Sequence, residues 1–288
     1  MVFCKINGVG NDFIIVNNIK ERIHEEKFSS LARKLCERHL SIGADGLIFI
    51  EQASDTKADF RMLTINADGS EAQTCGNGIR CAARFAWEEK LAGDHMKIQA
   101  TAGYTEAERL SKREYKIKLQ NITTFKRESR ITVNGREYSY TYVEVGNPGV
   151  PHIVVPVKGL KNANRETLLL DGQSLRYHGD FPKGANVNFC EAIDDNTVEL
   201  LTYERGVQAF TYACGTGSAS AAMVFQLQNI IKSGVITFKV PGGLLKVELV
   251  KKTGGSIGID DVGDTDIYLI GDTNIVCKGD ALDEDFVF

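Results

Sequence analysis

The sequence predicts a mixed α/β (α+β) fold of two pseudo-symmetric lobes, each a central helix wrapped by mainly antiparallel strands. One observation is a pair of cysteines, Cys75 and Cys214, that each open a Cys-Gly-x-Gly turn leading into a helix. They lie 139 residues apart in a chain of 288, close to half its length. Another is that both halves repeat the order strands, cysteine turn, helix, strands. A repeated order of this kind indicates an internal duplication.

In the first half, short apolar runs predict strands and one-sided apolar spacing predicts a helix. That helix covers about 27–39, because Phe28, Leu31 and Leu35 recur on one face. After the Cys75 turn, a second helix covers about 78–91. The predicted strands are 3–6, 13–16, 46–50, 60–65, 96–100, 105–110 and 115–119.

The helix after Cys214 covers about 217–232 and has no charged residue between Gly215 and Ile231. A helix that is apolar or small all round is usually buried, so we expect it at the centre of its lobe. The polar stretch 120–130 is predicted as a strand-poor link. The lobes are then 1–120, joined by a returning segment 272–288, and 121–271. The predicted strands here are 139–145, 152–157, 185–191, 198–202, 235–240, 244–249, 257–259 and 267–270.

Composition indicates an ordinary globular protein, with 43% apolar and 25% charged residues and a net charge of −4. A mildly acidic chain without a Lys/Arg run is a poor candidate for binding nucleic acid. No apolar stretch approaches the roughly 18 residues of a membrane span, and the start lacks the apolar core of a signal peptide. We therefore expect a cytoplasmic protein whose thiols stay reduced.

Seven cysteines are an odd number, which argues against a complete disulfide framework. There is no Cys-x-x-Cys pair, and the five histidines show no zinc-binding spacing. We therefore expect no metal site. Apart from Cys75 and Cys214, the cysteines have mostly apolar neighbours and are expected in the core; they are Cys4, Cys36, Cys81, Cys190 and Cys277.

The two cysteine turns suggest chemistry that needs a similar group on each side of one atom. The first residues of a helix present unpaired N–H groups and a positive dipole end, which favour a thiolate and bind a carboxylate. If the two turns face each other, one thiolate takes the α-proton of an amino acid. The opposite thiol then delivers a proton to the other face, which inverts the stereocentre.

A thiol hydrolase is the other chemical interpretation, with His152 as the base for Cys75 or Cys214. It explains one cysteine and leaves the second without a role. His152 follows Val150 and Pro151, and we expect it to be a turn residue bonded to the backbone.

At this point the chain resembles the diaminopimelate epimerase family, isomerases that work without pyridoxal phosphate. The resemblance runs nearly the whole length. It is carried by the segments 5–13 (KINGVGNDF), 43–46 (GADG), 66–70 (NADGS), 75–81 (CGNGIRC), 181–189 (FPKGANVNF), 204–206 (ERG) and 214–217 (CGTG).

The resemblance implies a role for each candidate residue in an active site between the lobes, with no metal or cofactor. Cys75 and Cys214 would be the acid/base pair of a two-base proton transfer. The α-carboxylate would be held by the amides of Gly76, Asn77, Gly215 and Thr216. Asn11 would line the pocket, and Glu204 would meet the reacting amine. The distal end of the substrate would be bound by Asn66, Asn186 and Arg205. The implied reaction is LL- to meso-diaminopimelate, in lysine and peptidoglycan precursor synthesis.

Two departures from the family pattern keep other substrates open. Val150 stands where the family commonly has Asn before Pro-His, and the segment 207–213 before Cys214 is one residue longer. The alternative is a racemase of another amino acid on the same fold, with histidine favoured. A binding or lyase relative that has abandoned racemisation is a third alternative, against which the presence of both cysteines argues. The expected partner is a small amino-acid substrate, with a homodimer as a possible assembly.

Overall fold

The computed structural model describes residues 1–72 and 75–282, which form two compact units. Unit 1 comprises residues 1–117 together with the chain from Gly271 onward, and unit 2 comprises 118–270. The chain enters unit 2 within β7 (Glu114–Leu119) and leaves it within β16 (Thr265–Asp272).

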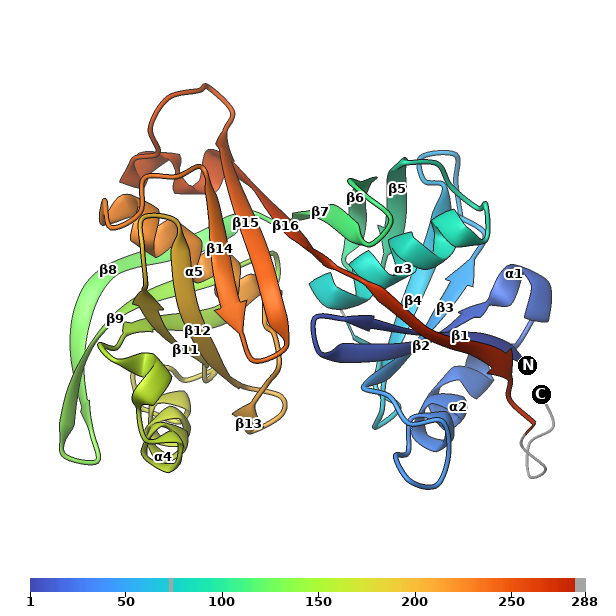
Figure 1. Ribbon diagram of the computed structural model, residues 1–288, viewed down its shortest axis with the longest axis horizontal. Helices are drawn as coiled ribbons and strands as arrows, with labels where there is room; N and C mark the ends of the chain where they lie inside the picture. Colours follow the sequence, from blue (N-terminus) through green and yellow to red (C-terminus); the bar gives the residue numbers. More distant parts are fainter. Residues whose placement is uncertain (73–74, 283–288) are drawn as a thin grey trace. The chain divides into compact units, whose positions relative to one another are not determined.

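Unit 1 is a strand array in the order β17-β1-β2-β3-β4-β5-β6-β7, in which β2–β3 and β4–β5 are parallel and the other pairs antiparallel. Its helix α3 contacts β1, β2, β3 and β6, so the array wraps around it (Figure 1). The elements are β1 (Val2–Gly8), β2 (Asn11–Asn17), α1 (Asn18–Glu21), η1 (Glu25–Lys27), α2 (Phe28–Leu35), β3 (Gly46–Glu51), β4 (Phe60–Asn66), α3 (Gly76–Glu88), β5 (His95–Ala100), β6 (Gly103–Arg109) and β17 (Asn274–Asp280).

Unit 2 has the order β8-β9-β10-β11-β12-β14-β15, in which β10–β11 and β12–β14 are parallel. Its helix α5 contacts β9, β10, β11 and β15. The elements are β8 (Ile122–Val133), β9 (Arg136–Val145), β10 (Val150–Pro156), η2 (Leu160–Asn162), α4 (Arg165–Arg176), β11 (Asn186–Ala192), β12 (Thr197–Glu204), β13 (Ala209–Phe210), α5 (Gly215–Leu227), β14 (Val235–Val240), β15 (Gly243–Lys251) and η3 (Ile259–Asp264).

The two units share one topology, which confirms the predicted pseudo-symmetric α/β fold of mainly antiparallel strands. In both, an antiparallel pair is followed by a parallel crossover that carries a helix, α2 in unit 1 and α4 in unit 2. An antiparallel neighbour comes next, and a second parallel crossover then carries the central helix, α3 or α5. Each central helix is 13 residues long and begins directly after its cysteine.

Alternation along the strands separates two apolar layers in each unit, because successive strand residues point to opposite faces. In unit 1, Ile14, Leu47 and Phe49 pack with α2 residues such as Leu31. In unit 2, Val155, Phe189 and Leu201 pack with α4 residues such as Leu168. The intervening residues face α3 or α5, and this face carries the chemistry described below.

Two sequence predictions about elements are wrong, and helix α4 was missed. Most of the stretch 120–130 belongs to the long strand β8, which begins at Ile122, rather than to a strand-poor link, because β8 is an edge strand whose exposed face is polar. Residues 257–259 form no strand, and Ile259 begins the 3₁₀ helix η3. Helix α4 was not predicted, since its buried residues (Leu168, Asp171, Gly172 and Leu175) include an acid and a glycine that mask its apolar face.

Candidate active-site elements

In unit 1, Cys75 is the N-cap of α3. Its backbone is extended (φ −136°, ψ 101°), and its Sγ accepts a hydrogen bond from the amide of Gly78 at 3.3 Å. The residue is half-buried. An N–H donor on the sulfur and the positive end of the helix dipole both favour a thiolate at this place. The amides of Gly76 and Asn77 lie in the same first turn of α3.

The side chain of Asn77 anchors this turn to the β1–β2 hairpin. Asn77 is buried, and its Nδ2 donates to Asn11 Oδ1 at 2.8 Å. Asn11 Nδ2 in turn donates to Asp45 Oδ2 at 2.6 Å. Arg38 bonds both Asp45 (2.9 Å) and Asp12 (2.6 Å). Two of the predicted site residues, Asn11 and Asn77, are therefore brought into direct contact beside the Cys75 turn.

Asn66 lies at the carboxyl end of β4, where the chain turns towards Cys75. Its side chain is exposed, and its Nδ2 donates to Ser70 Oγ at 3.0 Å. Its backbone amide also donates to the carbonyl of Ser70. The residue therefore closes the 66–70 turn.

In unit 2, Cys214 is the N-cap of α5 with nearly the same backbone conformation as Cys75 (φ −122°, ψ 108°). Unlike Cys75, it is buried, at 6% exposed. Its Sγ lies 3.7 Å from Thr216 Oγ1. The turn is tightly packed: a Cβ at Gly215 would lie 2.5 Å from Leu269, and a Cβ at Gly217 would overlap Asn188 Oδ1. Only glycine fits these two positions without a shift of neighbouring atoms.

Glu204, at the end of β12, is the charged neighbour of the second thiol, which hydrogen-bonds its carboxyl group. Thr211 Oγ1 also donates to this carboxyl at 3.3 Å. Burial raises the pKa of Glu204, against the effect of these two bonds. Burial first, and the nearby Glu204 second, raise the pKa of Cys214 well above its ordinary value. The expectation that a helix N-terminus lowers the pKa of a thiol is therefore wrong for Cys214, where burial dominates.

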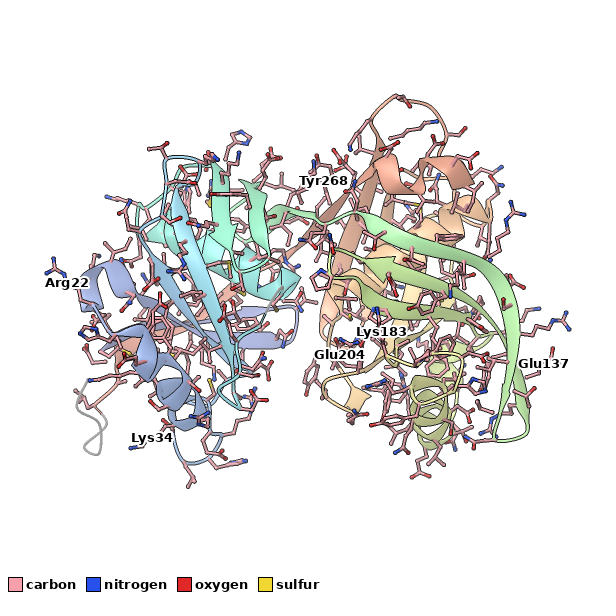
Figure 2. The ribbon with its side chains drawn as sticks, turned by 180° about the vertical axis from the view of Figure 1, so that it is seen from behind. Arg22, Lys34, Glu137, Lys183, Glu204 and Tyr268 are labelled. Atoms are coloured by element: carbon pink, nitrogen blue, oxygen red, sulfur yellow. The ribbon has the colours of Figure 1, made fainter. Side chains whose placement is uncertain are left out.

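Asn186 and Arg205 lie on neighbouring ends of β11 and β12. Asn186 is buried and its Oδ1 accepts the backbone amide of Arg205 at 2.7 Å. The Arg205 side chain is half-buried, and its Nη1 donates to the carbonyl of Lys183 at 3.3 Å. Figure 2 labels Glu204 and Lys183 on these adjacent segments of unit 2. The predicted distal residues Asn186 and Arg205 thus lie together, and Arg205 directly follows Glu204 in the sequence.

The sequence analysis expected His152 to be a turn residue, and this prediction is wrong. The residue lies within β10, fully buried, and burial lowers its pKa to about 3. Its Nδ1 lies 3.2 Å from Asn188 Nδ2, and Thr202 donates to Asn188 Oδ1 at 3.0 Å. These three side chains form a buried polar layer beneath the Cys214 turn, which no sequence pattern indicated.

The two departures from the family pattern lie in unit 2. Val150 is half-buried at the start of β10, opposite Val145. Asn147 is exposed, and its amide donates to Gln120 Oε1 at 3.0 Å. In the longer segment before Cys214, the ring of Phe210 packs edge-on against Tyr203 and Phe189 in the core of its unit.

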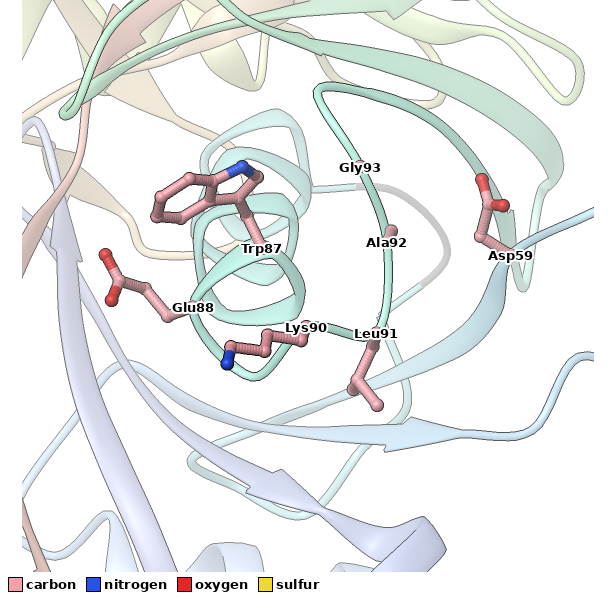
Figure 3. Close-up of a pocket in the computed structure, with 7 residues that line it drawn as sticks. All are labelled: Asp59, Trp87, Glu88, Lys90, Leu91, Ala92 and Gly93. Carbon is pink, nitrogen blue, oxygen red and sulfur yellow. The ribbon is translucent and has the colours of Figure 1, made fainter.

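A hollow in unit 1 lies at the far end of α3 from Cys75 (Figure 3). A 13-residue helix is about 20 Å long, so this hollow is remote from the cysteine turn. It contains none of the predicted site residues. Its lining residues are Asp59, Trp87, Glu88, Lys90, Leu91, Ala92 and Gly93.

Within residues 1–72 and 75–282, no cluster of three or more His, Cys, Asp or Glu side chains is arranged to hold a metal ion. Over the same residues, no helix is long and apolar enough to cross a membrane.

Comparison with known proteins decides the family. The diaminopimelate epimerase family model matches residues 3–121 and 144–265. The chain belongs to the diaminopimelate epimerase family. It is therefore an isomerase, a cofactor-independent amino-acid epimerase.

Relatives in the diaminopimelate epimerase family match nearly the whole chain. The diaminopimelate epimerase of Aquifex aeolicus is 36% identical over 296 residues, covering 99% of both chains. That of Hydrogenobaculum sp. is 38% identical over 259 residues, covering 86% of this chain and 91% of the relative. The fold also resembles that of the Bacillus anthracis phenazine biosynthesis protein of the PhzF family. That structure is 15% identical with a TM-score of 0.74, covering 98% of this chain and 99% of the other.

Proposed function

We propose that this epimerase interconverts LL- and meso-diaminopimelate by two-base proton transfer, with Cys75 and Cys214 acting on one α-carbon. The observation that carries the proposal is the matched placement of the two cysteines. Each is the extended N-cap of a 13-residue central helix in the corresponding crossover of a duplicated unit. A duplicated thiol with a duplicated set of helix N-terminal amides suits a reaction whose two directions are mirror images at one carbon.

In the proposed step, the thiolate of one cysteine takes the α-proton and becomes a thiol. The electron pair left on the α-carbon is delocalised into the carboxylate, which accepts hydrogen bonds from the amides of Gly76, Asn77, Gly215 and Thr216. The thiol of the other cysteine gives its proton to the opposite face and becomes a thiolate. Charge and protons balance, and the enzyme returns to its first state by exchange with water.

The distal end of the substrate would be held in unit 2 by Asn186 and Arg205 and in unit 1 by Asn66. A bidentate arginine suits a carboxylate, and asparagine can serve both an amine and a carboxylate. Glu204 would meet the reacting amine, and Asn11 would line the pocket. The neighbouring placement of Glu204, Arg205 and Asn186 supports this assignment.

Histidine is the second candidate substrate. It is favoured by Val150, a half-buried apolar side chain where the family commonly has an asparagine. The distal end of diaminopimelate carries two charged groups, whereas an imidazole tolerates an apolar neighbour. The other departure, the longer segment before Cys214, says less about the substrate than its sequence suggested. Its residue Phe210 packs into the core of unit 2.

The test is α-proton exchange followed by NMR in deuterated water, with LL-diaminopimelate and L-histidine offered separately. We expect exchange and epimerisation of diaminopimelate alone. Exchange of histidine with diaminopimelate inert would reassign the substrate while keeping the two-thiol chemistry. Cys75→Ala and Cys214→Ala are each expected to lower epimerisation at least about a thousandfold, since each removes one of two obligatory proton carriers. Undiminished epimerisation in either variant would refute the two-thiol mechanism.

We also propose that the protein works in the cytoplasm, with the small amino acid as its partner, and that it assembles as a homodimer. The seven free thiols support a reducing compartment. Sedimentation equilibrium tests the assembly, and a monomer at micromolar concentration would refute the dimer.

A further inference from the structure

Arg80 is a buried cation that the proposed reaction leaves without a role. It lies one turn into α3, five residues after Cys75, and none of its surface is exposed. Burial lowers its pKa to about 10, so the guanidinium is still charged at neutral pH. A buried charge is costly unless an opposite charge or hydrogen bonds compensate it.

The hydrogen bonds to Arg80 do not compensate that charge. Its Nη2 donates to Asn77 Oδ1 at 2.7 Å, and that acceptor is a neutral amide. Its Nε and Nη1 have no hydrogen-bond partner among the described residues. Arg84, one turn later on the same helix, is also buried but is paired with Glu88 at 2.6 Å. Arg80 has no such carboxylate partner among the described residues. Its charge therefore has to be compensated by another nearby anion.

Three titratable groups act electrostatically on Arg80, and two of them are not available as that anion. They are Cys81, Cys75 and Asp272. Cys81 is fully buried, and burial raises its pKa far above neutral, so it stays a thiol. Asp272 already bonds the side chain of Arg113 through both carboxylate oxygens. Cys75 remains, half-buried at the helix N-terminus with an amide donor on its sulfur.

We infer that Arg80 is a positioning residue that holds Cys75 as the thiolate in the unliganded enzyme. It also fixes the first turn of α3, because its bond to Asn77 Oδ1 leaves Asn77 Nδ2 directed to Asn11. The corresponding position in unit 2, five residues after Cys214, is Ala219, and the charged neighbour of Cys214 is Glu204. The resting enzyme therefore carries a thiolate on Cys75 and a thiol on Cys214. This assignment rests on the proposed two-thiol reaction for its use, but not for its test.

The test measures alkylation of Cys75 by iodoacetamide from pH 5 to 10, read by mass mapping of the modified peptides, with no substrate present. Cys277, which the sequence analysis expected in the core, is exposed and serves as the internal reference thiol. In the unaltered protein, we expect Cys75 to be alkylated at lower pH than Cys277. A Cys75 profile that coincides with that of Cys277 overturns the inference whatever the variants do.

The variants then assign the effect to the charge. In Arg80→Met, the alkylation profile of Cys75 is expected to move up by about one pH unit, so that alkylation at pH 5, below both thiol pKa values, slows about tenfold. In Arg80→Lys, which keeps the charge, the pH profile of Cys75 is expected to stay near that of the wild type. Arg84→Met is the matched control for loss of a buried arginine from α3, and its Cys75 profile is expected to be unchanged.

A merely structural role of Arg80 predicts a different pattern. Stability then falls in both Arg80→Met and Arg84→Met, while Cys75 keeps the wild-type alkylation profile; that result overturns the inference. If the Cys75 profile behaves as expected but neither amino acid undergoes α-proton exchange, the proposed reaction fails and the assignment of Arg80 stands.

Discussion

Replacement of Gly217 by alanine tests whether the packing beneath the Cys214 turn sets the geometry of the second proton carrier. A methyl group at Gly217 would overlap Asn188 Oδ1 and lie 3.2 Å from Cys214 Sγ. Asn188 is itself buried and is held by Thr202 and the backbone of Ile153, so it cannot swing away. The start of α5 has to move instead.

The size of the effect follows from that displacement. Relieving the overlap requires a movement of about 1 Å, and an error of that size in a reacting group costs on the order of a hundredfold in rate. Overpacking a close-packed interior costs about 1–3 kcal/mol of stability. We therefore expect Gly217→Ala to lower kcat about a hundredfold and the free energy of unfolding by about 1–3 kcal/mol.

The duplication supplies a matched control at Gly78, which stands three residues after Cys75 as Gly217 stands three after Cys214. A methyl group there would meet Cys75 Cβ and Ile48 Cδ1 at 3.4 Å, which is ordinary contact. Alanine is the better helix former by up to about 1 kcal/mol. Gly78→Ala is therefore expected to keep kcat within a few-fold and to leave stability unchanged or raised. Steady-state epimerisation and urea unfolding of both variants decide the matter, and equal losses in the two would refute the packing argument.

Two further predictions concern Glu204 and Asp171. In Glu204→Gln, loss of a charge-assisted hydrogen bond is expected to lower kcat/KM about 10- to 100-fold. Cys214 is also expected to react with iodoacetamide at lower pH, whereas the control Glu199→Gln on the same strand changes neither quantity. An alkylation profile of Cys214 that Glu204→Gln leaves unmoved would contradict the contact. Asp171 is fully buried and accepts bonds from Arg136, Tyr138 and Asn134, so Asp171→Asn is expected to lower the free energy of unfolding by about 1–3 kcal/mol at pH 7. Although burial acts the other way, these bonds lower the pKa of Asp171, so their contribution is present above the unfolded-state value near 3.9 and is lost as the pH falls through the folded value. Urea unfolding at pH 7 and pH 3 should show the wild type and variant converging in acid, and a constant difference would count against this assignment.

The cysteine turns were the most predictable part of the fold, because their signal is local. A glycine-rich turn followed by small and apolar residues predicts a helix start, and both α3 and α5 begin directly after their cysteines. Helix α4 has no such signal, since the buried Asp171 breaks its apolar face. Its counterpart in unit 1 is α2, which occupies the corresponding crossover.

The polar partners of the site were less predictable, because they come from strands distant in sequence. Asn11 and Asn77 are 66 residues apart and meet only when the β1–β2 hairpin packs on α3. Arg80 lies within the segment 75–81 that carries part of the family resemblance. Its burial, however, follows from the wrapping of strands around α3 rather than from the spacing of residues in the sequence. The charge of Cys214 was misjudged for the same reason, since burial by its own unit outweighs the local effect of the helix terminus.

The unequal surroundings of the two thiols have a kinetic consequence. An epimerase cannot alter the ratio of its two stereoisomers at equilibrium, since that ratio belongs to the amino acids alone. The ratio of kcat/KM in the two directions is therefore fixed. If the unequal charges near the two sulfurs raise kcat in one direction relative to the other, they must raise KM in that direction by the same factor. Different surroundings of the two thiols can thus favour turnover of one isomer. The accompanying cost is that the enzyme binds the other isomer, its product, more tightly.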